Sequence, residues 1–532
     1  MCKDTKVGRC GVRSTQKTRC YALFYREYMA GIKKITIPIK QDELTIEKVV
    51  PYLPTILDKF TKNAQKIRSD YETYCLQHDI LSKKRVHDDT DINNIVLEPH
   101  IKAMVDWKTG YVFGNPIKYA QTKDSETDDI TYLNKYARYA NRSAIDQEVA
   151  TWAYATGVGY YFVEPTSEKV DVETQAPFEL FCREADTCTK VYSSYNGKKP
   201  LFDLLYTTIN AINERGSKET FAILDIYLPD YYYQYRCPIS AINMPVGVAP
   251  SELELVNAEV RAIYKKLPLV EKRLNPDGIG IVEMSKCMQN ALDTIASNGV
   301  DNIQEVVNTI YKYMGINMGD TTDERVENHK NVRKNGAIVI PYLGNDKFQP
   351  DLKIENTSAL DFSDVLSFAE NIKRTMYETV GVPLATNSTN SGGTTKSGSE
   401  VANGYDNAYN RALTDINNFL PADTDLLDKM LFICQSTANN KVNDLQVSEI
   451  EIKYSLNLND NMQIKTQSLG TCIGIKMPPA MALRICRLSN DPEAEGKQWE
   501  NYIAKKEKEE NDRAIQAYQT QNIDTSNRDD EE

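Results

Sequence analysis

Residues 282–399 constrain the fold of this chain most strongly, because they hold two long amphipathic helical patterns followed by a bare polar loop. Apolar residues recur every three or four positions across 282–314 and again across 358–380, which places them on one face of each helix. The second pattern stops at Gly381, with Pro383 beyond it, a helix C-terminus signal. We predict helices of roughly 48 and 35 Å, a hairpin that an ordinary core could also contain.

The other segments mix helix and strand patterns. We predict helices at 44–79, 95–113, 133–156, 469–487 and 492–519, and a β-rich region at 178–264. Shorter strands are expected at 117–121, 160–164, 337–342, 352–354 and 449–457. Ser397 and Glu400 form a capping-box pattern before a further helix, in which Pro421 predicts a kink near Phe419. The tyrosines at 231–235 fit an amphipathic strand, and they could also stack on nucleic-acid bases.

Composition limits the classes of partner. The 532 residues, 41% hydrophobic and 26% charged, indicate a globular protein with more than one domain. The net charge of −12 argues against tight binding of nucleic-acid phosphates over a large surface. The second helical pattern has four acids and two bases, a net charge of −2, from Asp361, Asp364, Glu370, Glu378, Lys373 and Arg374. Such a helix suits a passage in which DNA slides, and equally any solvated helix face.

No catalytic or metal-binding constellation stands out in the sequence. The eleven cysteines form no CxxC pair and fit reduced thiols in a cytosolic setting. The chain has only four histidines, and its carboxylates form no cluster with the spacing of metal ligands. We therefore expect no metal, no cofactor and no catalytic residue. Residues 391–397 resemble the end of a phosphate-binding loop, but Thr395 replaces the required glycine and the segment follows a helix. The sequence contains no apolar run of about 18 residues, so it predicts no membrane span.

An ordered set of short motifs covers roughly residues 71–495. They include Asn-Asn-Ile-Val at 93–96, Gly-Tyr-Val-Phe-Gly-Asn-Pro at 110–116, the run at 267–283, Gln-Asn-Ala-Leu-Asp at 289–293, Gly-Val-Pro at 381–383, Ser-Gly-Gly-Thr-Thr-Lys-Ser-Gly at 391–398, and Met-Pro-Pro-Ala-Met-Ala-Leu at 477–483. No single motif is specific, but their order resembles the portal proteins of tailed double-stranded DNA bacteriophages.

This resemblance implies an α+β, portal-type multi-domain subunit with long helices that forms a ring. Its parts would be a basic N-terminal arm at 1–40, a wing at 41–281, a first stem helix at 282–315, a clip at 316–357, a second stem helix at 358–382, a tunnel loop at 383–398, a long kinked helix and strand of the wing at 399–465, crown helices at 466–520 and an acidic disordered tail at 521–532. The basic segment at 1–40 could equally be a disordered leader, with Met29 as the true initiator.

The function that the resemblance implies is mechanical. The subunit would form a dodecameric ring at one capsid vertex, through which double-stranded DNA is packaged and ejected without sequence specificity. Its partners would be other copies of itself, the major capsid protein, the terminase large subunit and later a head-completion or adaptor protein. It would reside in the virion, and in the host cytoplasm during assembly, with no membrane contact. Two alternatives stay open: a head–tail adaptor or minor capsid ring protein, and a DNA-acting enzyme with an unrecognised site.

Three groups of site residues follow from the resemblance. The DNA-facing tunnel loop would present Asn387, Ser388, Thr389, Asn390, Thr394, Thr395 and Lys396. Candidates to line the channel from the second stem helix are Asp364, Glu370, Lys373, Arg374 and Glu378. Candidates to dock the packaging motor from the clip are Asp323, Glu324, Arg325, Lys330 and Arg333.

Overall fold

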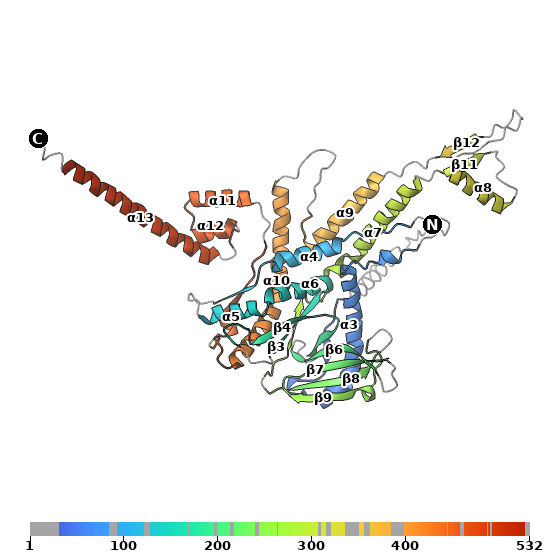
Figure 1. Ribbon diagram of the computed structural model, residues 1–532, viewed down its shortest axis with the longest axis horizontal. Helices are drawn as coiled ribbons and strands as arrows, with labels where there is room; N and C mark the ends of the chain where they lie inside the picture. The colour runs from blue at the N-terminus through green and yellow to red at the C-terminus, as the bar shows by residue number, and fades with distance from the viewer. Residues whose placement is uncertain are drawn as a thin grey trace, which may run out of the picture.

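The structure is a computed structural model. It describes residues 31–84, 93–121, 128–166, 171–195, 199–212, 218–239, 244–262, 264–306, 310–314, 321–335, 351–355, 362–384, 398–443, 445–457, 462–486, 488–489 and 492–526. Helices and strands are mixed along the chain, as the sequence predicts (Figure 1).

The lower part of the molecule in Figure 1 is a six-stranded sheet in the order β1-β5-β6-β7-β8-β9. The first pair, β1 (Ile35–Ile37) and β5 (Cys188–Ser193), is parallel, and the other pairs are antiparallel. The remaining strands are β6 (Pro200–Ile212), β7 (Lys218–Tyr227), β8 (Tyr231–Pro238) and β9 (Glu254–Val260). Helix α3 (Leu53–Tyr74) buries Leu53, Ile56, Leu57 and Phe60 against this sheet.

A second layer lies between that sheet and the long helices. It contains the antiparallel sheet β10-β3-β4, made of β10 (Leu269–Arg273), β3 (Val158–Pro165) and β4 (Phe178–Arg183). The pair β13 (Ile450–Lys453) and β2 (Lys118–Gln121) shares a hydrophobic cluster with this sheet. The helices of this layer are α4 (His100–Phe113), α5 (Asp128–Tyr139), α6 (Arg142–Thr156) and α10 (Gly398–Ser436). Residues of α4, α6 and α10 share one apolar core with the bases of the two long helices described next.

Two helices, α7 (Ile281–Val306) and α9 (Phe362–Val380), contact each other and extend from the body to the upper right of Figure 1. At their far end, β11 (Ile310–Met314) pairs antiparallel with β12 (Asp351–Glu355), next to α8 (Thr322–Asn335). We call α7, α9 and this tip the stem hairpin. On the opposite side of the molecule lie α11 (Met462–Gly474), α12 (Pro479–Cys486) and α13 (Pro492–Ser526).

Several elements differ from the sequence-based expectation. The first stem helix ends at Val306, and 310–314 form β11, so it is shorter than predicted. Residues 95–99 are not helical, because Pro99 disfavours a helical conformation in the residue before it. Asn141, with φ +53°, separates α5 from α6 where one helix was predicted.

Both ends of the chain also differ from expectation where they are described. Residues 31–40, which we grouped with the basic arm, contain β1 and bury Ile32, Ile35, Ile37 and Ile39. The acidic end is helical as far as Ser526. The charged helix predicted at 492–519 is confirmed, and the helical segment predicted at 469–487 is two helices, α11 and α12. Pro421 lies inside α10, and the kink there stays a prediction.

Buried ion pairs attach the C-terminal half of α10 to the strands of the second layer. Lys272 Nζ lies 3.0 Å from Asp423 Oδ1 and donates a hydrogen bond of 3.0 Å to Tyr161, and both charged residues are fully buried. Arg142 and Asp146 extend this cluster at 3.3 Å. Removing one member of such a group leaves a buried charge without its partner, which costs far more than the pair contributes. This half of α10 is therefore fixed to β10 and β3.

Candidate functional site

Besides the apolar Ile281, Val282 and Leu292, helix α7 buries a row of polar residues. Ser285, Gln289, Asp293 and Ser297, each four residues apart, are fully buried, whereas Cys287, which we assigned to the apolar stripe, is exposed. Met284, Met288 and Ile295 of that predicted stripe are only half-buried. Buried polar side chains are usually hydrogen-bonded, and Gln289, Asp293 and Ser297 find their partners in the backbone of residues 94–101. The Ser285 hydroxyl has no hydrogen-bond partner among the described residues.

The contacts form a series that we call the polar ladder. Asp301 Oδ1 accepts a hydrogen bond from the Asn94 backbone at 2.7 Å, and Ser297 Oγ accepts one from Val96 at 3.0 Å. Asp293 Oδ1 accepts from the Glu98 backbone at 3.0 Å. Gln289 completes the series: its Oε1 accepts from Ile101 N at 3.2 Å and its Nε2 donates to the Glu98 carbonyl at 2.5 Å.

Two different repeats match in this ladder. The helix presents an acceptor every four residues, about 6.0 Å along its axis. The facing segment donates from alternate residues, 94, 96 and 98, which in an extended chain lie about 6.6 Å apart. One polar residue per helical turn can therefore follow the backbone of a neighbouring extended segment. Its side chain accepts from N–H groups of that segment, which precedes helix α4 and has no helical hydrogen bonds of its own there.

Further side chains complete the base of the stem hairpin. His78 Nδ1 lies 2.6 Å from Asp293 Oδ2, and Lys83 Nζ donates to Asp301 Oδ2 at 2.9 Å. Charge-assisted hydrogen bonds of this kind are stronger than neutral ones. Tyr377 on α9 packs edge-on against His100, with ring centroids 5.8 Å apart. Residues from both stem helices thus contact the segment around α4.

The return helix α9 is buried only near the body. Met376 and Val380 are buried, and Gly381 ends the helix with φ +75°, as the sequence predicts. A Cβ on Gly381 would lie 2.6 Å from Arg411 Cγ. Toward the tip, apolar side chains are uncovered: Val300 is 40% and Ile303 59% exposed on α7, and Val365, Leu366 and Phe368 are 39%, 62% and 61% exposed on α9. Leu366 and Phe368 are two residues apart and so lie on opposite sides of α9, and uncovered apolar side chains on a projecting hairpin are typical of contact surfaces.

Comparison with known proteins decides the family. The family described as phage portal protein, SPP1 Gp6-like, matches residues 53–513, which is well over half of the chain. The chain belongs to this family of phage portal proteins. The portal protein of Bacillus phage SPP1 is 21% identical over 272 residues, an alignment that covers 49% of this chain and 52% of that protein. The chain therefore spans about half the length of this relative.

Two solved structures resemble this portal-family chain at low similarity. One is the neck of an empty GTA particle, with 12% identity and a TM-score of 0.34 over 70% of this chain and 84% of that chain. The other is the neck of a native GTA particle, with 10% identity and a TM-score of 0.36 over 74% of this chain and 96% of that chain. TM-scores of this size are too low to relate the folds.

The predicted channel residues lie on the solvent side of α9. Asp364, Glu370, Arg374 and Glu378 are exposed, and Lys373 is half-buried. Lys373 lies 3.8 Å from Glu370, and Arg374 lies 3.9 Å from Glu378. Exposed pairs at this spacing contribute roughly 0–1 kcal/mol, so these charges remain available to a facing surface.

The other two predicted groups are only partly described. All seven tunnel-loop residues, Asn387 to Lys396, lie outside the described part of the chain, as do the phosphate-loop-like segment and Ser397 of the predicted capping box. At the tip, Asp323, Glu324, Arg325 and Lys330 are exposed on α8, and Arg333 belongs to the same helix. Thr321 and Glu324 form a capping box with hydrogen bonds of 3.3 Å, which defines where α8 begins.

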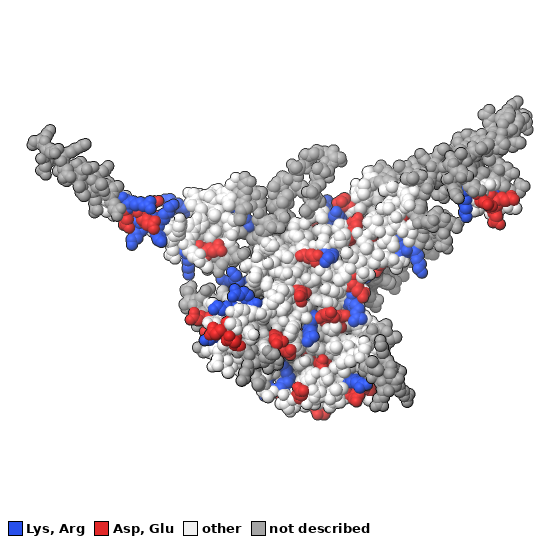
Figure 2. Space-filling view, viewed as in Figure 1, with Lys and Arg blue, Asp and Glu red and all other residues white. Residues whose placement is uncertain are grey.

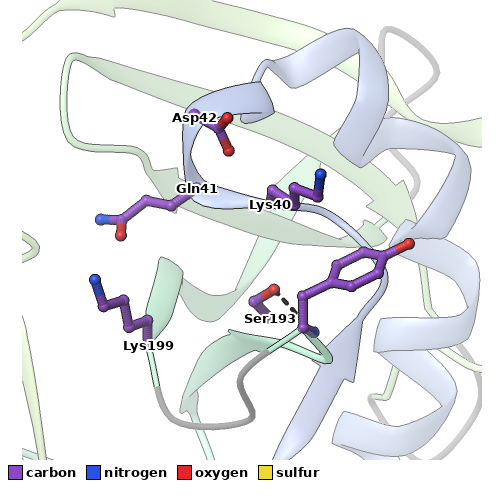
Figure 3. Close-up of a pocket in the computed structure, with 6 residues that line it drawn as sticks. Lys40, Gln41, Asp42, Ser193 and Lys199 are labelled. Carbon is purple, nitrogen blue, oxygen red and sulfur yellow. Dashed lines mark hydrogen bonds between the residues drawn. The ribbon is translucent and has the colours of Figure 1, made fainter.

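No group of three metal-ligating side chains occurs in the ranges that the structure describes. A hollow of about 670 Å³ is lined by Lys40, Gln41, Asp42, Ser193, Tyr195 and Lys199 (Figure 3). The Ser193 hydroxyl donates to the Ile39 carbonyl at 2.6 Å and accepts from the Tyr195 backbone at 3.2 Å, so it fixes this turn. Within the same ranges, no helix has the length and hydropathy needed to cross a bilayer.

The polar ladder is the feature that sequence reasoning missed. Its signal was present, because polar residues recur at exact four-residue spacing from 285 to 301. Periodicity places the apolar positions of this helix on one face, and we made no prediction of what the polar positions contact. Nothing in the helix pattern shows that an extended backbone lies against that face.

Proposed function

We propose that this chain is a portal subunit, a structural component of the virion, that assembles into a dodecameric ring at one capsid vertex. The stem hairpins of neighbouring copies pack side by side around a passage for double-stranded DNA. The terminase large subunit docks at the clip during packaging, and an adaptor protein docks there later. No covalent step is part of this function, so the energy for packaging comes from another protein.

The single observation that carries this proposal is the set of uncovered apolar side chains on the outer stem. Leu366, Phe368 and Ile303 are each more than half exposed, although each would gain about 1.5–3 kcal/mol from full burial. A second copy of the same hairpin offers a matching surface, and repeated head-to-tail contacts of this kind close into a ring. Family membership supports the same conclusion.

The charges of the molecule fit passage of DNA better than tight binding. On the face shown in Figure 2, Lys and Arg are interspersed with Asp and Glu and form no extended basic surface. Exposed acids on α9, Asp364, Glu370 and Glu378, would repel phosphates at close range. Duplex carries one negative charge per ~1.7 Å, so mixed charges along the stem would keep friction low.

Electron microscopy of the purified protein tests the ring directly. We expect hollow rings of about twelve subunits with a narrow stem. Replacing Leu366 and Phe368 together with Asp should abolish the rings and leave folded monomers with an unchanged circular dichroism spectrum, because both side chains are uncovered within one copy. The control is Val260→Asp on β9, where Val260 is 70% exposed, which should leave rings intact. A compact wild-type monomer, or normal rings from the double variant, would contradict the proposal.

The tunnel loop has its own test. Lys396 is the one charged residue between 384 and 398, so we propose that it is the residue there that attracts phosphates as DNA passes. Lys396→Ala should alter packaging or retention of DNA while rings still form. A normal genome content in mutant particles would remove this role.

A further inference from the structure

Helices α11 and α12 present an apolar surface that their own chain leaves uncovered. Ile473, Ile475, Met481 and Ile485 are 43%, 68%, 53% and 56% exposed. Met481 and Ile485 lie one turn apart on α12, so they share a face, while Ala482, Leu483 and Cys486 are buried beneath them. Single exposed apolar residues are ordinary, but four on one short helix pair indicate a contact surface.

Most of helix α13 is also uncovered by its own chain. It packs closely on α12 only at its start, where a Cβ on Gly496 would lie 2.6 Å from Ala480 Cβ. Beyond that point every residue from Glu500 to Ile515 is exposed, including Tyr502 at 63% and Ile515 at 55%. Most helices in proteins are stabilised by tertiary packing of one face, and this part of α13 has no such packing within its own chain.

One stretch of α13 is complementary in charge to the α11–α12 surface. Residues 462–486 contain three bases, Lys465, Lys476 and Arg484, and no acid. Residues 507–512 of α13 contain four acids and one base, although over the whole of 500–515 five acids and four bases leave a net charge of only −1. Figure 2 shows charged side chains gathered on α13 and few on the neighbouring surface of α11 and α12. Opposite charges of this kind favour and orient an association.

We propose that residues 500–515 of α13 in one copy pack on the α11–α12 surface of the next copy in the ring. This inference rests on the proposed ring. Helix α13 is continuous over 35 residues, about 52 Å at 1.5 Å per residue, and it points away from α12 (Figure 1). Its distal part therefore cannot return to the surface of its own chain. The occupant is a second copy, and the contact is head-to-tail, the kind that closes into a ring.

Photo-cross-linking tests the contact. The photoreactive residue p-benzoylphenylalanine replaces Tyr502 in the full chain, and copies with heavy and light isotopes are mixed before assembly. The expected products join position 502 of a copy with one isotope to a peptide within 473–485 of a copy with the other isotope. Intact rings that give only same-copy products, or no product at these positions, overturn the contact and leave the portal function standing. A product with nucleic acid or with another protein overturns the choice of a second copy.

A substitution gives an independent readout. Met481→Asp combined with Ile485→Asp should raise the concentration at which rings dissociate by about tenfold or more, because two central apolar contacts are lost. The matched control is again Val260→Asp, which should assemble like the wild type. Rings of wild-type stability from the α12 variant overturn the inference. A wild-type chain that never forms rings overturns both this inference and the portal function.

Discussion

At the base of the stem hairpin, Asp293 is fully buried and hydrogen-bonded to the backbone of Glu98, whereas toward the tip Leu366 is 62% exposed. The base is held within one copy by hydrogen bonds between buried polar groups and by the apolar core that it shares with α4, α6 and α10. The outer half has apolar groups without a partner in the same copy. We infer that folding of the monomer depends on the base and that assembly depends on the outer half, so substitutions in the two regions should separate the two properties.

The largest effect on monomer stability is expected from Asp293→Ala. The side chain accepts from Glu98 N at 3.0 Å and from Gln289 at 2.9 Å, and it pairs with His78 at 2.6 Å. Its loss leaves several buried donors unsatisfied, so the free energy of unfolding should fall by about 3–5 kcal/mol. Urea denaturation measures this. Thr294→Ala, at the neighbouring exposed position, is the control, and a loss below about 1 kcal/mol would remove the ladder's role.

Asp70, which lies on α3 close to Glu283 at the start of α7, should make stability depend on pH. Burial raises the pKa of its carboxyl to about 6, an effect partly offset by Lys66 at 3.4 Å. Between pH 4 and 6 the folded state therefore holds a proton that the unfolded chain has lost, so this contribution is present below about pH 4 and is lost as pH rises through 6.

Asp70→Asn should remove that dependence. The difference in unfolding free energy between wild type and variant should change by roughly 3 kcal/mol across the window, with the wild type losing stability relative to the variant as pH rises. Thermal unfolding at half-unit pH steps measures it. Parallel pH curves for the two proteins would show that Asp70 does not titrate there.

Gly381→Ala should have a smaller effect at the end of α9. The φ of +75° is unfavourable for a residue with a side chain, and the added Cβ would lie 2.6 Å from Arg411 Cγ. We expect a loss of about 1–2 kcal/mol in urea denaturation. Gly299→Ala, inside α7 with open space around its Cβ, is the matched control and should be neutral or slightly stabilising.

The smallest effect on the monomer is expected from Phe368→Ser. Phe368 is 61% exposed, so the free energy of unfolding, measured for dilute monomer, should stay within about 0.5 kcal/mol. Ring assembly by the same protein should weaken. A large loss of monomer stability would mean that the outer stem is already part of a folded core, and the contrast between the two halves would disappear.

The sequence predicts much of this architecture because its periodic patterns report local structure. The second stem helix, its end at Gly381, the strands around 221–227 and 231–235, and the helix from Pro492 are all found. Tertiary partners are different, because periodicity does not show what lies opposite a face. Ser297 and Lys272 look solvated in the sequence, yet both are buried against groups from distant segments. The roles of Lys396 and of the α9 charges stay predictions, since they depend on neighbouring copies and on DNA.

The polar ladder also limits its own length. Its two repeats differ by about 0.6 Å per step, so three or four steps accumulate roughly 2 Å, beyond which a side chain no longer meets its donor. The facing segment in fact turns into α4 at His100. A mismatch of this kind limits how much of the stem is anchored: α7 is hydrogen-bonded to the facing segment as far as Gln304, whose Oε1 accepts from Asn94 Nδ2 at 2.8 Å, and we infer that the stem beyond it is aligned by neighbouring copies.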